Sequence, residues 1–129
     1  MKNTTKALCT LIAAAFVAVS AYAGEFADIG IKDVQTLADS KQAVIIDANS
    51  PDSYKSGHVP GALSFAAIKD NLAASLPADK STLIIAYCGN PKCGAYLSAA
   101  KAAEKLGYTN IKHMSAGIAG WKDAGMKTE

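Results

Sequence analysis

Two short segments that are almost wholly apolar restrict the fold of this chain more than any other feature. Residues 43–46 read Ala-Val-Ile-Ile, and residues 82–87 read Thr-Leu-Ile-Ile-Ala-Tyr. A strand with one face in solvent alternates apolar and polar residues, whereas an uninterrupted apolar run is typical of a strand covered on both faces. The two segments therefore predict strands of a parallel sheet that lies between two layers of helices. Residues 62–65 and 110–114 are predicted as shorter strands.

Segments with helical character separate the predicted strands. Ser50 followed by Pro51 is an N-cap with proline at the first helical position, and Gly107 is a helix stop. Helices are predicted over residues 32–38, from residue 51 onward, and over residues 66–76, 94–106 and 116–124. The alternation predicts a single α/β domain, a small three-layer sandwich with a mostly parallel five-stranded sheet and helices on both faces.

The first 23 residues have the pattern of a secretory signal peptide. Two lysines precede an apolar stretch at residues 7–19, and residues 21–23 read Ala-Tyr-Ala, a small-x-small cleavage site. The apolar stretch is shorter than the roughly 20 residues of a membrane span, so cleavage is favoured over a retained anchor. We predict cleavage after Ala23, a periplasmic or secreted location, and a mature domain at residues 24–129.

Removing the predicted signal also removes the net charge. The full chain has 13 lysines, no arginine and 11 acidic residues. Lys2 and Lys6 belong to the signal, which leaves 11 lysines against 11 acids in the mature domain. A neutral domain without a cluster of basic residues has no electrostatic footprint for nucleic acid. Neither nucleic acid nor, after cleavage, a membrane is an expected partner.

A loop with a cysteine near each end follows the second apolar run. It begins at Cys88, directly after the predicted strand, and Asp47 occupies the matching place after the first apolar run. In parallel sheets, binding sites form outside the carboxyl ends of the strands, so Asp47 and Cys88 mark the predicted site. The candidate substrate-binding loop consists of Gly89, Asn90, Pro91, Lys92, Cys93 and Gly94.

Cys88 lies where its thiol can become a nucleophile. A free thiol has a pKa of about 8.5 and is mostly protonated near neutrality. Backbone amides of a turn rich in Gly and Pro, and the positive end of the following helix, favour the thiolate. Alternatively, Cys88 is a small buried hydrophobe or part of a structural disulfide with Cys93. One C-x4-C pair without further ligands does not make a zinc site, and we expect no cofactor.

Five short motifs occur in order along the mature chain. They are residues 44–47 with the helix start at 50–54, Gly-His-Val-Pro-Gly-Ala at 57–62, Tyr-Cys at 87–88, Leu-Gly-Tyr with Asn-Ile at 106–111, and Gly-Ile-Ala-Gly-Trp with Ala-Gly at 117–125. Each motif alone is weak, but together they resemble the single-domain rhodanese family of sulfurtransferases. The resemblance covers nearly all of the mature chain and implies a rhodanese-like fold.

The resemblance implies a covalent role for Cys88. In that family the loop cysteine accepts a sulfane sulfur from a donor such as thiosulfate, becomes a persulfide, and passes the sulfur to cyanide or a thiol. By the same resemblance, the amides of residues 89–94 stabilise the persulfide, and the partners are a small sulfur donor and a thiol acceptor. Asp47 and His58 are expected to support the loop through hydrogen bonds rather than to transfer protons.

Two positions depart from the family pattern. The family usually has an arginine at the end of the loop, where this chain has Cys93, and another after the strand aspartate, where it has Asn49. Without arginine, no guanidinium can bind the thiosulfate oxyanion through paired hydrogen bonds, and Lys92 offers only a point charge. We therefore predict a less anionic donor, a polysulfide or a small-thiol persulfide.

Three roles are open for Cys93. It can be a spacer at the helix start, a resolving thiol that attacks the Cys88 persulfide and releases hydrosulfide as a disulfide forms, or half of a redox lock. We favour the spacer, because a disulfide requires Cα atoms within about 7 Å and a cradle-shaped loop need not bring its ends so close. A disulfide cycle would also require a thiol reductant as partner.

Other functions compete with the sulfurtransferase. One is a catalytically silent rhodanese-like module that binds a partner or senses redox state, which the missing arginines favour and the retained Cys88 opposes. Another is a dithiol oxidoreductase that uses Cys88 and Cys93 directly. A phosphatase of the related fold is disfavoured, because it needs a longer loop that ends in arginine, where this chain has Gly94. We favour the sulfurtransferase.

Overall fold

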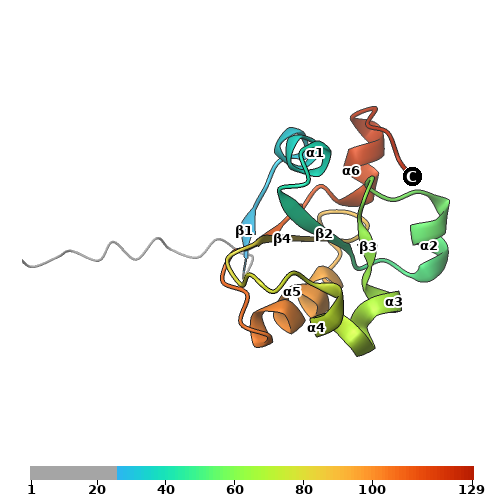
Figure 1. The fold of residues 1–129 in the computed structure, drawn as a ribbon. Coiled ribbons are helices and arrows are strands. Elements are labelled where there is room, and N and C mark those ends of the chain that lie inside the picture. Colours follow the sequence, from blue (N-terminus) through green and yellow to red (C-terminus); the bar gives the residue numbers. More distant parts are fainter. Residues whose placement is uncertain (1–25) are drawn as a thin grey trace, which may run out of the picture.

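The computed structural model describes residues 26–129, which form one sheet of five strands between helices (Figure 1). The strands are β1 (Ala27–Asp28), β2 (Ala43–Asp47), β3 (Leu63–Ser64), β4 (Leu83–Tyr87) and β5 (Ile111–His113). Their order across the sheet is β1-β5-β4-β2-β3, and every neighbouring pair is parallel. The predicted signal peptide and the predicted cleavage site lie outside the described residues.

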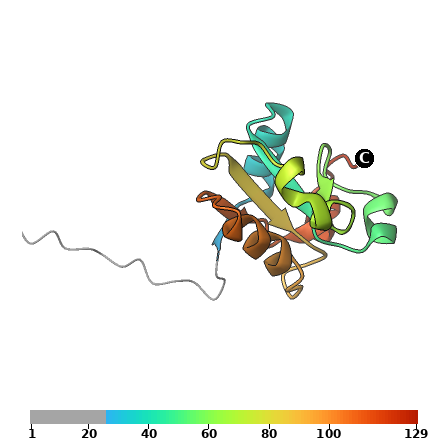
Figure 2. The same cartoon turned by 60° about the horizontal axis from the view of Figure 1, so that its bottom comes forward.

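Helices cover both faces of the sheet, as Figures 1 and 2 show. One face carries α1 (Ile31–Asp39) and α6 (Gly117–Asp123); the other carries α3 (Phe65–Ile68), the 3-10 turn η1 (Lys69–Asn71), α4 (Leu72–Ser75) and α5 (Tyr96–Lys105). The helix α2 (Pro51–Ser56) lies beside the edge strand β3. This arrangement confirms the predicted three-layer α/β sandwich with a parallel sheet. No helix within residues 26–129 is long and apolar enough to cross a membrane.

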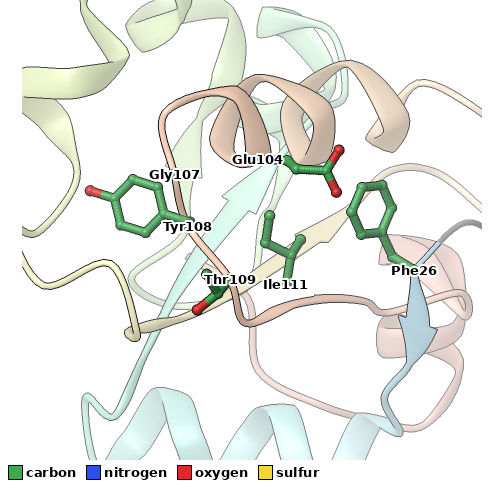
Figure 3. A pocket seen from close by; sticks show the side chains of 6 residues that line it. All are labelled: Phe26, Glu104, Gly107, Tyr108, Thr109 and Ile111. Atoms are coloured by element: carbon green, nitrogen blue, oxygen red, sulfur yellow. The ribbon is translucent and has the colours of Figure 1, made fainter. Parts of the chain in front are cut away.

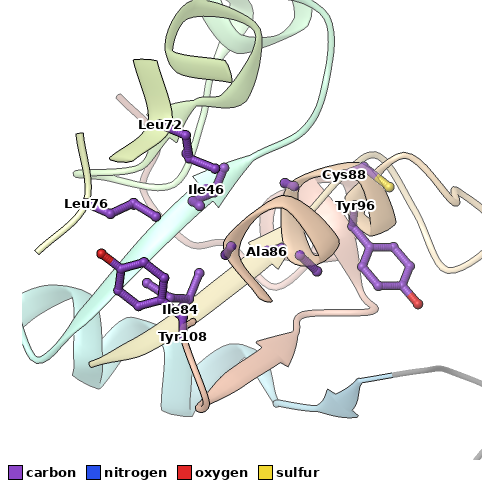
Figure 4. Close-up of a cluster of buried hydrophobic side chains, with 11 residues drawn as sticks. Ile46, Leu72, Leu76, Ile84, Ala86, Cys88, Tyr96 and Tyr108 are labelled. Carbon is purple, nitrogen blue, oxygen red and sulfur yellow. The ribbon is translucent and has the colours of Figure 1, made fainter. Parts of the chain in front are cut away.

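Successive residues of the central strand β4 enter opposite cores, which explains its uninterrupted apolar sequence. Ile84 and Ala86 pack with α4 and α5 (Figure 4), whereas Ile85 and Tyr87 pack with α1 and α6. Side chains alternate between the faces along a strand, so a strand covered on both faces needs apolar residues at every position. Cys88 continues the alternation and belongs to the core beneath α5.

The local start signals of α2 form as predicted. Ser50 has an extended backbone and its hydroxyl accepts a hydrogen bond from the Ser53 amide at 3.3 Å. Pro51 is the first helical residue, where its missing N–H costs nothing. The short helix therefore begins at a fixed residue just beyond β2, and the chain between them contributes to the carboxyl edge of the sheet.

Two elements differ from the sequence-based prediction. The helix predicted over residues 66–76 is three short pieces, α3, η1 and α4, because Asn71 adopts φ −136° and ψ 35°, outside the helical region. Asparagine competes with helical hydrogen bonds through its own side chain, and it follows two charged residues that face solvent. The strand β1, which the sequence did not predict, pairs with β5 alone. It has only two residues, too few to show an apolar or alternating pattern.

Candidate active site

The predicted site residues meet at the carboxyl ends of β2 and β4. Asp47 is the last residue of β2 and lies opposite Tyr87, the last residue of β4, so Cys88 follows directly beside it. Asp47 and Cys88 are both 1% exposed. Figure 4 shows the Cys88 sulfur at this end of β4, in the cluster that also contains Tyr96 at the start of α5. The topology thus brings the strand end, the loop and a helix start together.

The first half of the loop, Cys88–Gly89, is held from outside by α6. The Ile118 amide donates to the Cys88 carbonyl at 2.9 Å, and the Ala119 amide donates to the Gly89 carbonyl at 3.0 Å. Gly117 precedes them with φ +66°, and a Cβ at Gly117 would lie 2.6 Å from the Gly89 carbonyl carbon. A glycine is therefore required for the loop to approach α6 so closely.

This support also sets the direction of the loop amides. A trans peptide points its N–H opposite to its C=O, and residues 26–129 contain no cis peptide. With the Cys88 and Gly89 carbonyls bound to α6, the amides of Gly89 and Asn90 point away from α6. Within the described chain these two amides donate no hydrogen bond, nor do those of Gly94, Ala95 and Tyr96. Both ends of the loop therefore offer unoccupied donors to an anion.

The second half of the loop, Asn90–Gly94, is closed by its own turn. The Cys93 amide donates to the Asn90 carbonyl at 3.0 Å, and the Lys92 amide donates to Asn90 Oδ1 at 2.9 Å. Asparagine before proline favours this combination, since the asparagine side chain mimics a backbone turn and Pro91 presets its own φ. The amides of Lys92 and Cys93 are thus already engaged, and Pro91 has none, so part of the predicted cradle is unavailable to a persulfide.

The turn brings the two cysteines together. Cys88 and Cys93 form a disulfide with their Cα atoms 6.2 Å apart. The structure therefore favours a bridge over the spacer that we expected, because the turn at Asn90 folds the loop back far enough for the two cysteines to meet. Cys88 Sγ also lies 3.3 Å from the Cys93 carbonyl oxygen, which can accept its S–H when the pair is reduced. Cys93 is partly exposed, in contrast to Cys88.

A buried chain of hydrogen bonds anchors the strand ends beneath the loop. The Tyr87 hydroxyl donates to Asp47 Oδ2 at 2.7 Å and accepts from the Val59 amide at 3.0 Å. The other carboxylate oxygen of Asp47 accepts a hydrogen bond from the backbone amide of Asn49 at 2.7 Å. Burial is the main cause that raises the pKa of Tyr87 far above its usual value, so the phenol stays protonated. Asp47 thus bonds the backbone between β2 and α2 and the Tyr87 hydroxyl, but no amide of residues 88–94. Sequence reasoning missed the contact with Tyr87.

His58 lies in the turn after α2, and its side-chain contacts are with Tyr54 and Glu129. Its Nδ1 lies 2.8 Å from the Tyr54 carbonyl oxygen, and its ring stacks on the Tyr54 ring with centroids 3.7 Å apart. Its Nε2 lies 3.8 Å from a Glu129 carboxylate oxygen. These contacts tie α2 to the end of the chain, and none of them involves Cys88.

The side-chain amide of Asn49 lies beside the loop with an unengaged donor. Asn49 is partly buried, and its Nδ2 has no hydrogen-bond partner within residues 26–129. Its Oδ1 lies 3.6 Å from the position of a Cβ at Gly89, so the amide group is adjacent to the loop. Lys92 is exposed. The site therefore offers the neutral side-chain amide of Asn49 where an arginine is usual in the family that the sequence resembles.

Tyr96 and His113 form a second feature that sequence reasoning missed. Their rings stack with centroids 3.3 Å apart, at the start of α5 and the end of β5. His113 is 7% exposed, and its Nε2 has no hydrogen-bond partner within the described residues. Burial lowers the pKa of His113, and Asp28 opposes that shift. The stack joins the helix that follows the loop to the strand next to β4.

The pocket in Figure 3 lies elsewhere. It is lined by Phe26, Glu104, Gly107, Tyr108, Thr109 and Ile111 and has a volume of about 400 Å³. Phe26 precedes β1, Ile111 begins β5, and the other four residues lie at the end of α5 or between α5 and β5. The pocket is therefore at the amino edge of the sheet, opposite to the carboxyl edge that carries Cys88. The candidate active site is thus a buried sulfur at a loop and not this pocket.

Comparisons with known proteins agree with the fold. A rhodanese-like domain matches residues 31–124. A thiosulfate sulfurtransferase, GlpE of Pseudoalteromonas translucida, is 32% identical over 101 residues, which cover 77% of this chain and 91% of that protein. The crystal structure of BH2092 from Bacillus halodurans superposes with a TM-score of 0.68 at 26% identity, over 80% of this chain and 76% of the other. The rhodanese-like domain of Alr3790 from Anabaena superposes with a TM-score of 0.63 at 22% identity, over 79% of this chain and 77% of the other.

Proposed function

The chain belongs to the rhodanese-like family, and on that premise we propose that it is a sulfurtransferase in which Cys88 carries sulfane sulfur as a persulfide. The observation that carries the proposal is the position of Cys88 at the end of the central strand, beside the unoccupied amides of Gly89 and Asn90. Such donors stabilise a thiolate and a persulfide anion alike.

The proposed reaction consists of two displacements at sulfur. In the first, the Cys88 thiolate attacks the terminal sulfane sulfur of a polysulfide or a thiol persulfide. The S–S bond of the donor breaks, and the shortened polysulfide or the thiolate leaves with the electron pair. In the second, an acceptor thiolate attacks the outer sulfur of the Cys88 persulfide, and Cys88 returns as a thiolate.

The charges near the loop favour a donor other than thiosulfate. The relative from Pseudoalteromonas translucida is a thiosulfate sulfurtransferase, but this chain has no arginine to bind the sulfonate group through paired hydrogen bonds. Lys92 is exposed, and the side-chain amide of Asn49 beside Gly89 is neutral. A polysulfide or thiol persulfide places less demand on a fixed cation at this position.

Intact mass spectrometry tests the proposal in the Cys93→Ser variant, which cannot close the bridge. We expect the reduced variant to gain the mass of one sulfur atom from inorganic polysulfide and little or none from thiosulfate. The same measurement on Cys88→Ser is the matched control and should show no gain. If Cys93→Ser gains no sulfur from either donor, or if Cys88→Ser gains as much, the proposed function is wrong.

The disulfide itself favours a second candidate function. Because Cys88 and Cys93 are bonded across the candidate site, a dithiol oxidoreductase would need no sulfane sulfur at all. It would reduce a disulfide substrate such as insulin when supplied with a dithiol, and both cysteines would be essential. Absence of insulin reduction, together with sulfur loading of Cys93→Ser, would exclude this second function.

A further inference from the structure

We propose that Cys93 is the resolving thiol of the persulfide carried by Cys88: it attacks the inner sulfur, releases the outer sulfur as hydrosulfide, and leaves the Cys88–Cys93 disulfide for a dithiol reductant to reopen. The inference rests on the proposed persulfide of Cys88. It goes beyond that function because the product becomes free hydrosulfide and the electrons come from a dithiol, instead of the sulfur passing intact to an external thiol.

The geometry of the loop places Cys93 within reach of the required atom. In the persulfide the inner sulfur is Cys88 Sγ, the same atom to which Cys93 is bonded in the structure. A thiol that can bond to Sγ in the disulfide can therefore attack Sγ in the persulfide. The Cα separation of 6.2 Å is one at which disulfides form.

The loop also holds Cys93 in place before the reaction. Its amide is bound to the Asn90 carbonyl, and the Lys92 amide is bound to the Asn90 side chain, so the turn keeps its shape without the S–S bond. The Cys88 carbonyl is bound to the Ile118 amide. Both ends of the reacting pair are thus positioned by hydrogen bonds that reduction leaves intact.

The step balances in atoms and electrons. The Cys93 thiolate forms a bond to Cys88 Sγ, and the bond between Sγ and the outer sulfur breaks. The outer sulfur leaves with the electron pair as hydrosulfide, so it is reduced by two electrons while the two cysteine sulfurs are oxidised to the disulfide. A dithiol then returns two electrons and becomes a disulfide itself.

The exposure of the two cysteine residues sets the order of the two steps that reduce the disulfide. Cys88 is 1% exposed, whereas Cys93 is partly exposed, so an incoming thiolate reaches Cys93 first. Attack there expels Cys88 as a thiolate beside the unoccupied amides of Gly89 and Asn90. The second thiol of the reductant then releases Cys93. The partner is therefore a dithiol, either a small molecule or a dithiol protein, that docks at the exposed second half of the loop.

The test follows hydrosulfide release and intact mass together. Reduced wild type, Cys93→Ser and Cys88→Ser each receive one equivalent of inorganic polysulfide without added thiol. We expect wild type to release about one hydrosulfide per chain above the Cys88→Ser background and to end as the disulfide, lighter than the reduced chain by two hydrogen atoms. Cys93→Ser should keep the added sulfur and release roughly tenfold less hydrosulfide until an external thiol is added. Cys93→Ala repeats the test without a hydroxyl.

The outcomes separate this inference from the proposed function. If wild type keeps the added sulfur as long as Cys93→Ser does, or if peptide mapping finds the sulfur on Cys93, the resolving role is wrong while the sulfurtransferase stands. If Cys93→Ser never gains sulfur although its far-ultraviolet circular dichroism and melting match wild type, the proposed function fails and this inference with it. Reduction of the wild-type disulfide should pass through a mixed disulfide at Cys93; capture at Cys88 instead would overturn the proposed order of attack.

Discussion

The two halves of the loop are held by different means. Cys88 and Gly89 are bound to α6, a segment far along the chain, through two amide–carbonyl hydrogen bonds and a contact that only glycine permits. The stretch from Asn90 to Gly94 is held by a turn of its own residues and is mostly exposed. The buried cysteine is thus placed by tertiary structure, and the accessible one by local sequence.

This difference suggests a division of labour. A nucleophile must meet donors in one fixed geometry, which tertiary contacts can impose. A thiol that has to meet an external reductant needs access, and a local turn provides position without burial. We therefore expect changes to the external support to cost stability and sulfur loading together, and changes to the turn to alter the fate of the loaded sulfur while leaving the fold intact.

The largest effect is expected from Gly117→Ala, which would break the external support. The new Cβ would lie 2.6 Å from the Gly89 carbonyl carbon at a φ of +66°, so the loop or α6 has to move. We expect a loss of about 3 kcal/mol or more in the free energy of unfolding, measured by urea denaturation, and strongly reduced sulfur loading by mass.

Gly125→Ala is the matched control for that change. Gly125 also has a positive φ, +75°, but a Cβ there meets no atom within 4 Å. Its cost should be limited to the backbone term of about 1–2 kcal/mol, with loading of Cys88 unaffected. Equal losses in the two variants would show that the contact between Gly117 and the loop carries no special weight.

Tyr87→Phe should have the next largest effect, because it removes the hydroxyl beneath the first half of the loop. The Val59 amide and the Asp47 carboxylate would each lose a buried partner. We expect the free energy of unfolding to fall by about 2–3 kcal/mol in urea titrations. Tyr54→Phe, which removes a single hydrogen bond to the Ala62 carbonyl, should cost about 1 kcal/mol; a larger loss there than at Tyr87 contradicts the prediction.

Asn90→Ala should sharpen the comparison at the second half of the loop. It removes the side-chain acceptor of the Lys92 amide in an exposed turn, so unfolding should change by less than about 1 kcal/mol. Loading of Cys88 should persist, whereas closure of the Cys88–Cys93 bridge after loading should slow several-fold. The rate of hydrosulfide release measures this closure. In Asn110→Ala, the exposed control, the rate should match wild type. Unchanged closure in Asn90→Ala would show that the turn does not position Cys93.

The smallest effect is expected from pH, through the Tyr96–His113 stack behind the loop. Burial lowers the pKa of His113 below its ordinary 6.5, so the unfolded chain binds a proton more readily than the folded one. The contribution to stability is therefore full above about pH 6.5 and is lost as the pH falls through the lower folded pKa. Urea midpoints should decrease in that range. The urea midpoint of His113→Gln should decrease less steeply with falling pH. A parallel decrease of the midpoint in both proteins would assign the effect to other groups.

The parts of the molecule that could be predicted from sequence are those that short segments determine. The apolar run of residues 43–46 is a strand because both its faces are covered, and Ser50 with Pro51 starts a helix through contacts a few residues apart. Placement of Asp47 and Cys88 at one edge follows from the parallel sheet alone. These signals sufficed for the fold and for the edge of the sheet at which Asp47 and Cys88 lie.

The parts that could not be predicted depend on residues far apart in the chain. Nothing in the run of residues 83–87 shows that its tyrosine hydroxyl meets Asp47 and Val59, which come from other segments. The bridge of Cys93 was misjudged for another reason. A cradle-shaped loop was expected to keep its ends apart, whereas Asn90 closes a turn that shortens the distance between the cysteines.

The close approach of Gly117 to the loop also determines what a protein engineer could transplant. Residues 88–94 form a short contiguous segment and would fit between a strand and a helix of another scaffold. Such a graft would carry both cysteines and the Asn90 turn, yet it would lack the two amides of α6 that orient the Cys88 and Gly89 carbonyls. The recipient would acquire a dithiol without an aligned nucleophile. The smallest portable unit is therefore the loop together with a helix start that begins in glycine.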